Sequence, residues 1–312
     1  MSLSDTGQTH WQPSASEQAL IARSQLLTLI RSFFLERGLI EVQTPLVTAD
    51  GITDPHIDSV ALAGGGFLRT SPEYAHKRLL AAGIGDLFEL GPVFRQGEHG
   101  QRHRQQFTLL EWYRRGLSWR QLAEETLELI RHCNPERRWQ IKWLAWRDAF
   151  SAIDGMDPMT ITDPELETLT PSLPNDCDRD MRLDFLLATE IQPHFPKDQL
   201  TVLHHYPASQ AALARLSPED PRFACRFEVF AGPLELANGY HELCNPEEQR
   251  RRFIQDNRYR QQLGKPTMPI DETFLAALQA GLPDCSGIAL GVDRLLMALL
   301  DRTDIADVVA FD

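Results

Sequence analysis

Four segments of this 312-residue chain place charged and aromatic side chains where they can bind a charged ligand. In the first, Phe94-Arg95 precedes a polar loop and a strand-like run from Phe107 to Tyr113. Alternate residues of a strand share one face of a sheet, so Phe107, Leu109, Glu111 and Tyr113 point the same way. An aromatic ring, a carboxylate and a phenol on one face suit the floor of a ligand pocket. Taken alone, these residues are better explained by a sheet face packed on a helix, with Glu111 paired to an arginine.

The second segment runs from Glu235 to Glu242 and carries a carboxylate at each end. In a regular strand these two residues face opposite sides, because they are seven positions apart. Asn238-Gly239 can supply a β-bulge that reverses the alternation and lets both carboxylates converge. Two converging carboxylates require a cation, which is a metal, an ammonium or an arginine. A plain edge hairpin with a kink at Asn238-Gly239 is the alternative.

The third segment, Gly287 to Arg294, places a strand, the turn residue Gly291 and a helix N-terminus in succession. Such a corner favours an anion. Arg294 falls in the first helical turn, where a cation opposes the helix dipole, which indicates that its guanidinium serves a ligand. Pairing of Arg294 with Asp293 or another surface acid remains the alternative.

The fourth segment, Thr70-Ser71-Pro72-Glu73, has the pattern of a helix start. Ser71 is a typical N-cap, Pro72 is typical of the first helical position, and the helix dipole favours Glu73 there. Capping alone explains these residues without a ligand.

The elements that must position these segments can be predicted from periodicity and capping. We expect helices over 17–37, from 71–73 onward, over 118–132, 179–190 and 245–264, and after Gly291. We expect strands over 39–42, 67–70, 86–95, 106–113 and 285–290, and a hairpin over 225–242 that turns at 231–233. This order, without regular βαβ units, predicts an α+β fold with an antiparallel sheet flanked by helices. Residues 1–15 are predicted to be a flexible tail, 16–312 a single domain, and 134–178 an insertion within it.

Composition narrows the class of protein further. The chain has 31 Lys plus Arg and 44 Asp plus Glu, a net charge of −13, which repels phosphate backbones at long range. The five cysteines are scattered without a C-x-x-C pair, which argues against a disulfide framework and a cysteine zinc site. No apolar run reaches the roughly 20 residues of a membrane span, and no signal-peptide pattern is present. We expect a cytoplasmic protein with no membrane partner.

In their order along the chain, the four segments resemble the catalytic domain of class II aminoacyl-tRNA synthetases. The run Leu39 to Pro45 after a long helix resembles motif 1, Phe94 to Glu111 resembles motif 2, and Gly287 to Arg294 resembles motif 3. The Thr70–Glu73 and Glu235–Glu242 segments resemble the lysyl branch. The resemblance extends from about residue 17 to the C-terminus and implies the class II catalytic fold.

Some features depart from a lysyl-tRNA synthetase. Motif 1 begins near residue 20, which leaves no room for the domain that reads the anticodon, so no anticodon recognition is expected. Ser71 stands where lysyl enzymes carry Ala, and Ala289 where they carry Gly. These traits are similar to the elongation factor P–(R)-β-lysine ligases. That resemblance implies ATP-dependent activation of (R)-β-lysine, or lysine, as an adenylate and its transfer to a lysine side chain of elongation factor P.

The resemblance implies roles for individual residues, with ATP and Mg²⁺ as cofactors. Arg95, Arg294 and Glu235 would be catalytic, Phe107 would stack on adenine, and Gly291 would let the backbone approach ATP. The implied ATP-binding set is Arg95, Gln96, Gly97, Glu98, Arg104, Phe107, Glu235, Leu236, Gly291 and Arg294. Glu235 and Glu242 would hold the metal. The implied amino-acid-binding set is Ser71, Pro72, Glu73, Glu111, Tyr113, Asn238 and Glu242, with Glu242 and Tyr113 at the distal ammonium.

The motif 2 loop departs from the ligase pattern. Gly97 replaces an acid, with Glu98 in the next position, and Arg104 and Gln106 replace an Asn and a Glu. Two alternatives therefore stay open: a free-standing ligase acting on tRNA or a small molecule, and a non-catalytic regulatory paralogue. Motif 1 also implies a homodimer, for which Ile21, Leu27, Ile30 and Phe34 are candidate interface residues or ordinary core.

Overall fold

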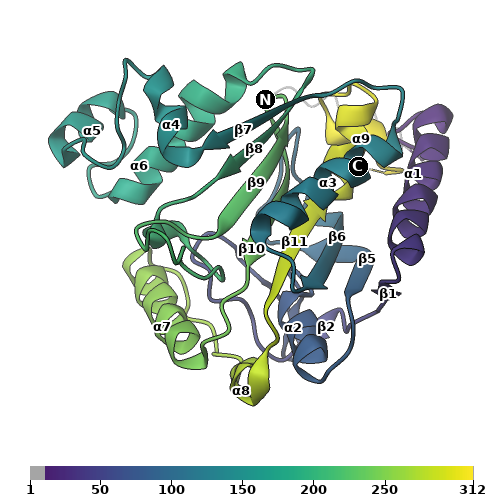
Figure 1. Cartoon of the computed structure of the whole chain (residues 1–312), viewed down its shortest axis with the longest axis horizontal. Helices are drawn as coiled ribbons and strands as arrows, with labels where there is room; N and C mark the ends of the chain where they lie inside the picture. The colour runs from purple at the N-terminus through teal and green to yellow at the C-terminus, as the bar shows by residue number, and fades with distance from the viewer. Residues whose placement is uncertain (1–10, 312) are drawn as a thin grey trace, which may run out of the picture.

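A mixed eight-stranded sheet forms the centre of the computed structural model, which describes residues 11–311 (Figure 1). The strand order is β1-β5-β6-β11-β10-β9-β8-β7. All neighbours pair antiparallel except the two edge pairs, β1 with β5 and β8 with β7, which are parallel. The strands are β1 Ile40–Glu41, β5 Leu87–Phe94, β6 Gln106–Arg115, β7 Gln140–Ala145, β8 Gln199–His204, β9 Arg226–Ala231, β10 Leu234–His241 and β11 Cys285–Gly291. The predicted α+β architecture is confirmed.

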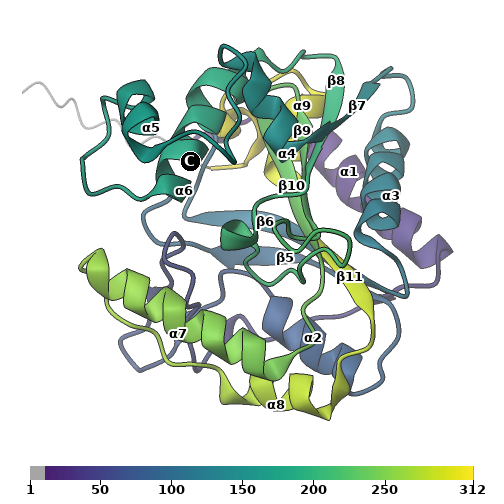
Figure 2. The same ribbon diagram turned by 60° about the vertical axis from the view of Figure 1, so that its left-hand side comes forward.

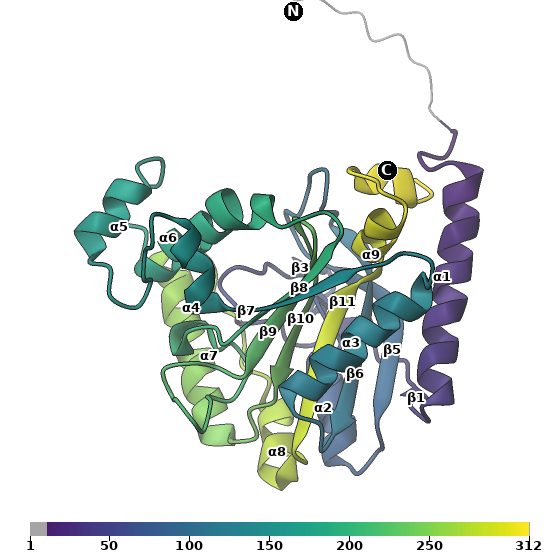
Figure 3. The same ribbon diagram turned by 45° about the horizontal axis from the view of Figure 1, so that its top comes forward.

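One face of the sheet is covered by three helices, α1 (Glu17–Glu36), α3 (Trp119–Cys133) and α9 (Val292–Leu299) (Figure 3). Their apolar side chains share one core cluster with the sheet residues Leu110 and Trp112. Ser16 caps α1 by accepting a hydrogen bond from the Ala19 amide at 3.2 Å, as its residue type predicts.

The other face is partly covered by α2 (Glu73–Ala81), α7 (Pro246–Gln262) and α8 (Glu272–Gly281), which lie together (Figure 2). They pack around Phe253 and Phe274 and contact the sheet through Leu87 and Tyr113. Because Trp112 belongs to the first core and Tyr113 to this one, the strand alternation predicted for this segment is confirmed.

Residues 134–178, predicted as an insertion, contribute an edge strand of the main sheet, β7, and two short helices, α4 (Trp146–Ala149) and α5 (Asp163–Leu169). With α6 (Arg179–Leu186) and the π-helical turn η2 (Leu187–Ile191), these helices enclose a second apolar core that includes Trp146, Phe150 and Leu183. The predicted helix over 179–190 is therefore divided at Leu186.

Two smaller predictions need adjustment. The strand at Phe67–Leu68 (β4) belongs to a separate small sheet with β2 (Val47–Thr48) and β3 (Val60–Ala61). Helix α2 begins at Glu73 with Pro72 as N-cap residue, one position later than predicted, and the Ser71 hydroxyl accepts from the Glu73 amide at 3.0 Å. The remaining turns of helix are 3₁₀ segments, at Phe150–Ala152, Gln192–His194, Ala208–Gln210 and Ile305–Val308.

The two ends of the described chain lie against each other. The Ser14 amide donates to the carbonyl of Ala310 at 2.9 Å, and the Ser14 hydroxyl donates to that of Val309. Most of the tail predicted over 1–15 lies outside the described residues. Across residues 11–311, none of the helices combines the length and the apolar character that crossing a membrane requires.

Candidate active site

One cavity of about 220 Å³ gathers side chains from all four segments predicted to carry chemistry. It opens on the sheet face that carries Glu111 and Tyr113. The predicted residues that line it are Ser71, Glu73, Arg95, Glu98, Arg104, Phe107, Glu111, Tyr113, Glu235, Leu236, Asn238, Gly291 and Arg294. Four predicted residues are absent from its lining: Pro72, Gln96, Gly97 and Glu242.

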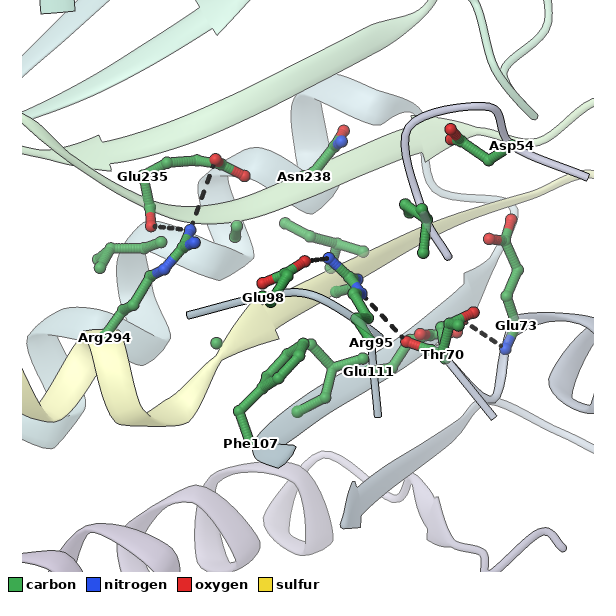
Figure 4. A pocket seen from close by; sticks show the side chains of 18 of the residues that line it. Asp54, Thr70, Glu73, Arg95, Glu98, Phe107, Glu111, Glu235, Asn238 and Arg294 are labelled. Atoms are coloured by element: carbon green, nitrogen blue, oxygen red, sulfur yellow. Dashed lines mark hydrogen bonds and ion pairs between the residues drawn. The ribbon is translucent and has the colours of Figure 1, made fainter. Parts of the chain in front are cut away.

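The cavity has two chemically different ends (Figure 4). Arg294 and Glu235 lie at one end, Glu73 lies at the other, and Arg95 lies between them above Phe107. This separation suits a ligand pair with phosphates at one end and ammonium groups at the other.

Arg294 reaches across from α9 to strand β10 at the first end. Its Nη1 donates to the Glu235 carbonyl at 3.1 Å and lies 3.5 Å from the Glu235 carboxylate, and its Nε donates to the Arg102 carbonyl. Asp293 pairs elsewhere, with Arg23. The predicted alternative of pairing with Asp293 is therefore wrong, whereas pairing with another acid occurs, at Glu235. The Arg294 guanidinium lines the cavity despite its unfavourable place in the helix.

Arg95 is held beside the aromatic ring of motif 2. Its guanidinium carbon lies 5.1 Å from the Phe107 ring centroid, Nη1 lies 3.6 Å from the Glu98 carboxylate, and Nε donates to the Thr70 carbonyl at 3.4 Å. A flat ring with a cation beside it offers stacking and charge to a nucleotide.

The acidic end is buried. The Tyr113 hydroxyl donates to Glu111 Oε1 at 2.9 Å, while Glu111 Oε2 accepts no hydrogen bond within residues 11–311. Burial raises the pKa of Tyr113 well above its ordinary value, and the charge of Glu111 adds to this effect. The phenol is therefore a permanent donor, which leaves Glu111 one oxygen to offer a guest.

Glu111 is supported by a buried imidazole. His76 Nδ1 lies 3.5 Å from Glu111 Oε1, and His76 Nε2 lies 3.0 Å from Glu89, which also pairs with Arg69 at 2.6 Å. Burial opposes protonation of His76, yet hydrogen bonds to Glu111 and Glu89 raise its pKa overall.

Lys77 is the residue that sequence reasoning missed at this end. Its ammonium lies 2.7 Å from Glu73 Oε1 and 2.6 Å from Glu242 Oε2, and its side chain has 0% exposure. A Glu and a Lys four residues apart on a helix usually form a surface pair, so the spacing gave no signal of burial.

Glu242 lies behind the cavity wall. A Cβ atom added at Gly287 would lie 2.2 Å from Tyr113 Cε1 and 2.5 Å from Glu242 Oε1, so only glycine at this position leaves room for both side chains. Glu235 and Glu242 do not converge as predicted: Glu235 lines the cavity beside Arg294, whereas Glu242 is outside the lining beside Lys77.

The bulge predicted at Asn238-Gly239 occurs earlier in strand β10. Glu235 pairs with Phe230 and Ala237 with Val229, so Leu236 is the extra residue. Gly239 has a different role, because a Cβ there would lie 2.6 Å from the Phe227 ring. The predicted position of the bulge was therefore wrong: the bulge is at Leu236, and Gly239 is required because a larger residue would collide with Phe227.

Two further acids near the cavity were also missed. Asp54 lines it from a loop that α7 holds in place, since Arg260 donates to the carbonyl of Asp54 at 2.8 Å. Glu228 on β9 pairs with Arg226 at 2.6 Å. Burial raises the pKa of Glu228 to about 7, with the charge of Glu235 adding to the shift and Arg226 opposing it.

Comparison with known proteins adds three findings. Residues 8–312 match the family described as tRNA synthetases class II (D, K and N). The chain is 44% identical over 322 residues to a protein of Haemophilus influenzae (strain PittGG) named elongation factor P–(R)-β-lysine ligase, with 98% of each chain covered. Proteins of the same name in Pasteurella multocida (strain Pm70) and Histophilus somni (strain 2336) are 44% and 43% identical, over at least 97% of each chain.

Proposed function

The chain belongs to the class II tRNA synthetase family of the D, K and N group, and from this premise we propose that it is an ATP-dependent, AMP-forming ligase. Its substrates are (R)-β-lysine, or lysine, and a lysine side chain of elongation factor P, the acceptor named in its relatives. The observation that carries this proposal is the single cavity with guanidinium groups at one end and buried carboxylates at the other. We place the reaction in the cytoplasm, where translation occurs.

The acidic end supports a substrate with two ammonium groups. Glu73 and Glu111 reach the cavity directly, and Tyr113 supplies a fixed hydroxyl beside them. A neutral side chain in this site would leave buried carboxylates without partners, which costs binding free energy. Discrimination against neutral amino acids follows from that cost.

The phosphate end supports activation of the substrate carboxylate. An oxygen of that carboxylate attacks the α-phosphorus of ATP and forms a new P–O bond. The bond between the α-phosphorus and the bridging oxygen breaks, and pyrophosphate leaves. Arg95 and Arg294 neutralise two approaching anions and the charge that develops between them, so no side-chain nucleophile is needed. The acceptor amine then attacks the mixed anhydride, an amide forms, and AMP leaves with the bonding electrons.

Mg²⁺ fits Glu235 better than it fits Glu242. Glu235 lines the cavity with a side chain 39% exposed, whereas Glu242 is outside the lining and already faces the Lys77 ammonium. Glu228 is a second carboxylate on the neighbouring strand β9, but it is outside the cavity lining and pairs with Arg226 at 2.6 Å. We therefore propose that Glu235 holds Mg²⁺, where the ion would offset phosphate charge.

A homodimer is the assembly that we propose. Four apolar residues at the end of α1, on the edge strand β1 and at the start of β2 expose between 40% and 56% of their surface: Leu35, Ile40, Leu46 and Val47. An exposed apolar edge of this kind favours pairing with a second copy. Of the residues predicted for this interface, Ile30 and Phe34 are fully buried core and only Ile21 is exposed.

The test is to incubate the protein with labelled (R)-β-lysine, ATP, Mg²⁺, elongation factor P and bulk tRNA. We expect label in the protein acceptor, in amide linkage, together with pyrophosphate exchange that depends on lysine or β-lysine. Label in tRNA or in a small molecule instead would favour the free-standing ligase. Absence of exchange with every amino acid would favour the regulatory paralogue.

A further inference from the structure

Lys77 is an ammonium group of the protein itself within the acidic end of the site. It comes from the first turns of α2, and its Nζ lies 2.7 Å from Glu73 and 2.6 Å from Glu242. The Phe274 ring centroid lies 5.8 Å from Nζ on another side. No part of the Lys77 side chain is exposed, so solvent does not weaken these contacts.

The Lys77 ammonium contacts only one carboxylate oxygen of Glu73 and only one of Glu242. It contacts Oε2 of Glu242, whereas Glu242 Oε1 lies beneath Gly287 and accepts no hydrogen bond within residues 11–311. It contacts Oε1 of Glu73, a residue that lines the cavity. Lys77 thus orients both carboxylates: Glu73 lines the cavity, and Glu242 lies behind the cavity wall with its Oε1 free of hydrogen bonds.

The buried charges at this end match a guest with two ammonium groups. With a guest bound and Glu73, Glu111 and Glu242 ionised, the Lys77 ammonium reduces three negative charges to two. The His76 imidazole beside Glu111 is shared with Glu89. Without Lys77 the same space would hold three, and three carboxylates in one buried site repel one another and take up protons.

We propose that Lys77 is a positioning residue that determines the amine selectivity of this site. It orients Glu73 and Glu242, favours their ionised forms, and restricts the guest to two ammonium groups. This inference rests on the proposed function, because it concerns the amino-acid half of the same cavity.

The direction of the pKa shifts agrees with this role. Burial raises the pKa of Glu242, the charge of Lys77 opposes that shift, and Glu73 adds to it. Burial acts to lower the pKa of Lys77, but Glu242 and Glu73 outweigh it, so the ammonium keeps its proton. When Lys77 is removed, the influences left on Glu242 from burial and Glu73 both raise its pKa. A protonated Glu242 then donates where an ammonium needs an acceptor.

A purely structural bridge between α2 and the strand end at Glu242 is the competing explanation. It predicts lower stability for any substitution of Lys77, but no change in the pH at which the amino acid binds. Positioning predicts such a change, because it acts through ionisation of Glu242.

The experiment measures lysine and (R)-β-lysine binding by calorimetry from pH 6.5 to 9.5 for the wild type and Lys77→Met. Lys142→Met, an exposed lysine on β7, is the matched control. At pH 7 we expect Lys77→Met to weaken binding by about tenfold to a hundredfold, the value of one lost charged contact. The midpoint of its pH dependence should move to higher pH, while Lys142→Met follows the wild type.

Two additional variants keep the test decisive if Lys77→Met folds poorly. Lys77→Arg retains the cation and should retain the wild-type midpoint. Lys77→Ala should regain affinity on addition of propylammonium and not of propanol. Unchanged affinity and midpoint in Lys77→Met, or weakening without a midpoint shift or propylammonium rescue, overturns this inference alone. A wild type that binds neither amino acid overturns the proposed substrate as well.

Discussion

Arg23 donates to the Asp293 carboxylate at 2.5 Å, and this ion pair joins the first long helix, α1, to the last, α9. The second Asp293 oxygen accepts from the Thr108 amide on β6 at 2.8 Å. One carboxylate thus fixes the start of α9 against the motif 2 strand. Because the start of α9 is held in place, the side chain of the next residue, Arg294, extends into the cavity from a fixed backbone position.

Asp293→Ala should lower the free energy of unfolding by about 3 kcal/mol, because it leaves the partly buried Arg23 guanidinium without its acid. Urea denaturation measures the loss. Asp163→Ala is the matched control, since Asp163 is 74% exposed where it pairs with Arg179 and should change stability by less than about 1 kcal/mol. Equal effects of both substitutions would contradict the structural role of Asp293.

Arg294→Ala should reduce pyrophosphate exchange by about 10²–10³, the usual effect of losing one charged contact to a transition state in a water-poor site. Lysine binding measured without ATP should stay near the wild-type value, because Arg294 lies at the opposite end of the cavity from Glu73. Arg302→Ala, an exposed arginine beyond α9, is the control. Wild-type exchange in Arg294→Ala would remove this residue from the phosphate site.

Amino-acid binding should become tighter as the pH rises from 6.5 to about 8. Burial raises the pKa of Glu242 to about 8, so this carboxyl carries a proton in much of the free protein at pH 7. A guest ammonium favours the carboxylate, and binding therefore releases that proton, with up to about tenfold in affinity per pH unit below the pKa. Calorimetry in buffers of different protonation heat detects the release. Proton uptake, or affinity independent of pH, would show that Glu242 is already ionised.

Gly287→Ala should abolish lysine binding and also lower stability, by about 1–3 kcal/mol, because it overpacks a buried site. The new methyl group would lie 2.2 Å from the Tyr113 ring and 2.5 Å from Glu242, so at least one of the two must leave its position. Gly64→Ala is the control, since a Cβ there has no atom within 4 Å. We expect calorimetry to give wild-type affinity for Gly64→Ala and no measurable binding for Gly287→Ala.

Sedimentation velocity should give a dimer for the wild type and a monomer for Val47→Lys. Val47, on the edge strand β2 of the small sheet, is 54% exposed, and a charge there opposes burial against a second copy. Ile254→Lys on α7, where Ile254 is 40% exposed, should leave the dimer intact. A wild-type monomer would contradict the proposed assembly.

The sequence by itself determined the elements and much of the site. Strand alternation from Phe107 to Tyr113 placed Glu111 and Tyr113 on one face, and the Ser16 cap marked the start of α1, because both are properties of neighbouring residues. The order of the four segments indicated the class II synthetase family, which residues 8–312 match. The placement of Arg294 against the helix dipole indicated a ligand before any partner was visible.

Only the tertiary structure decided how the charges are distributed. Nothing in the spacing of Glu73 and Lys77 separates a surface pair from a buried bridge to Glu242, 165 positions along the chain from Lys77. The role of Gly239 also depends on the tertiary structure. The sequence indicated a kink at this glycine, whereas in the fold it makes room for the Phe227 ring. Backbone conformation depends on nearby residues, whereas desolvation and charge compensation depend on which distant side chains the fold brings together.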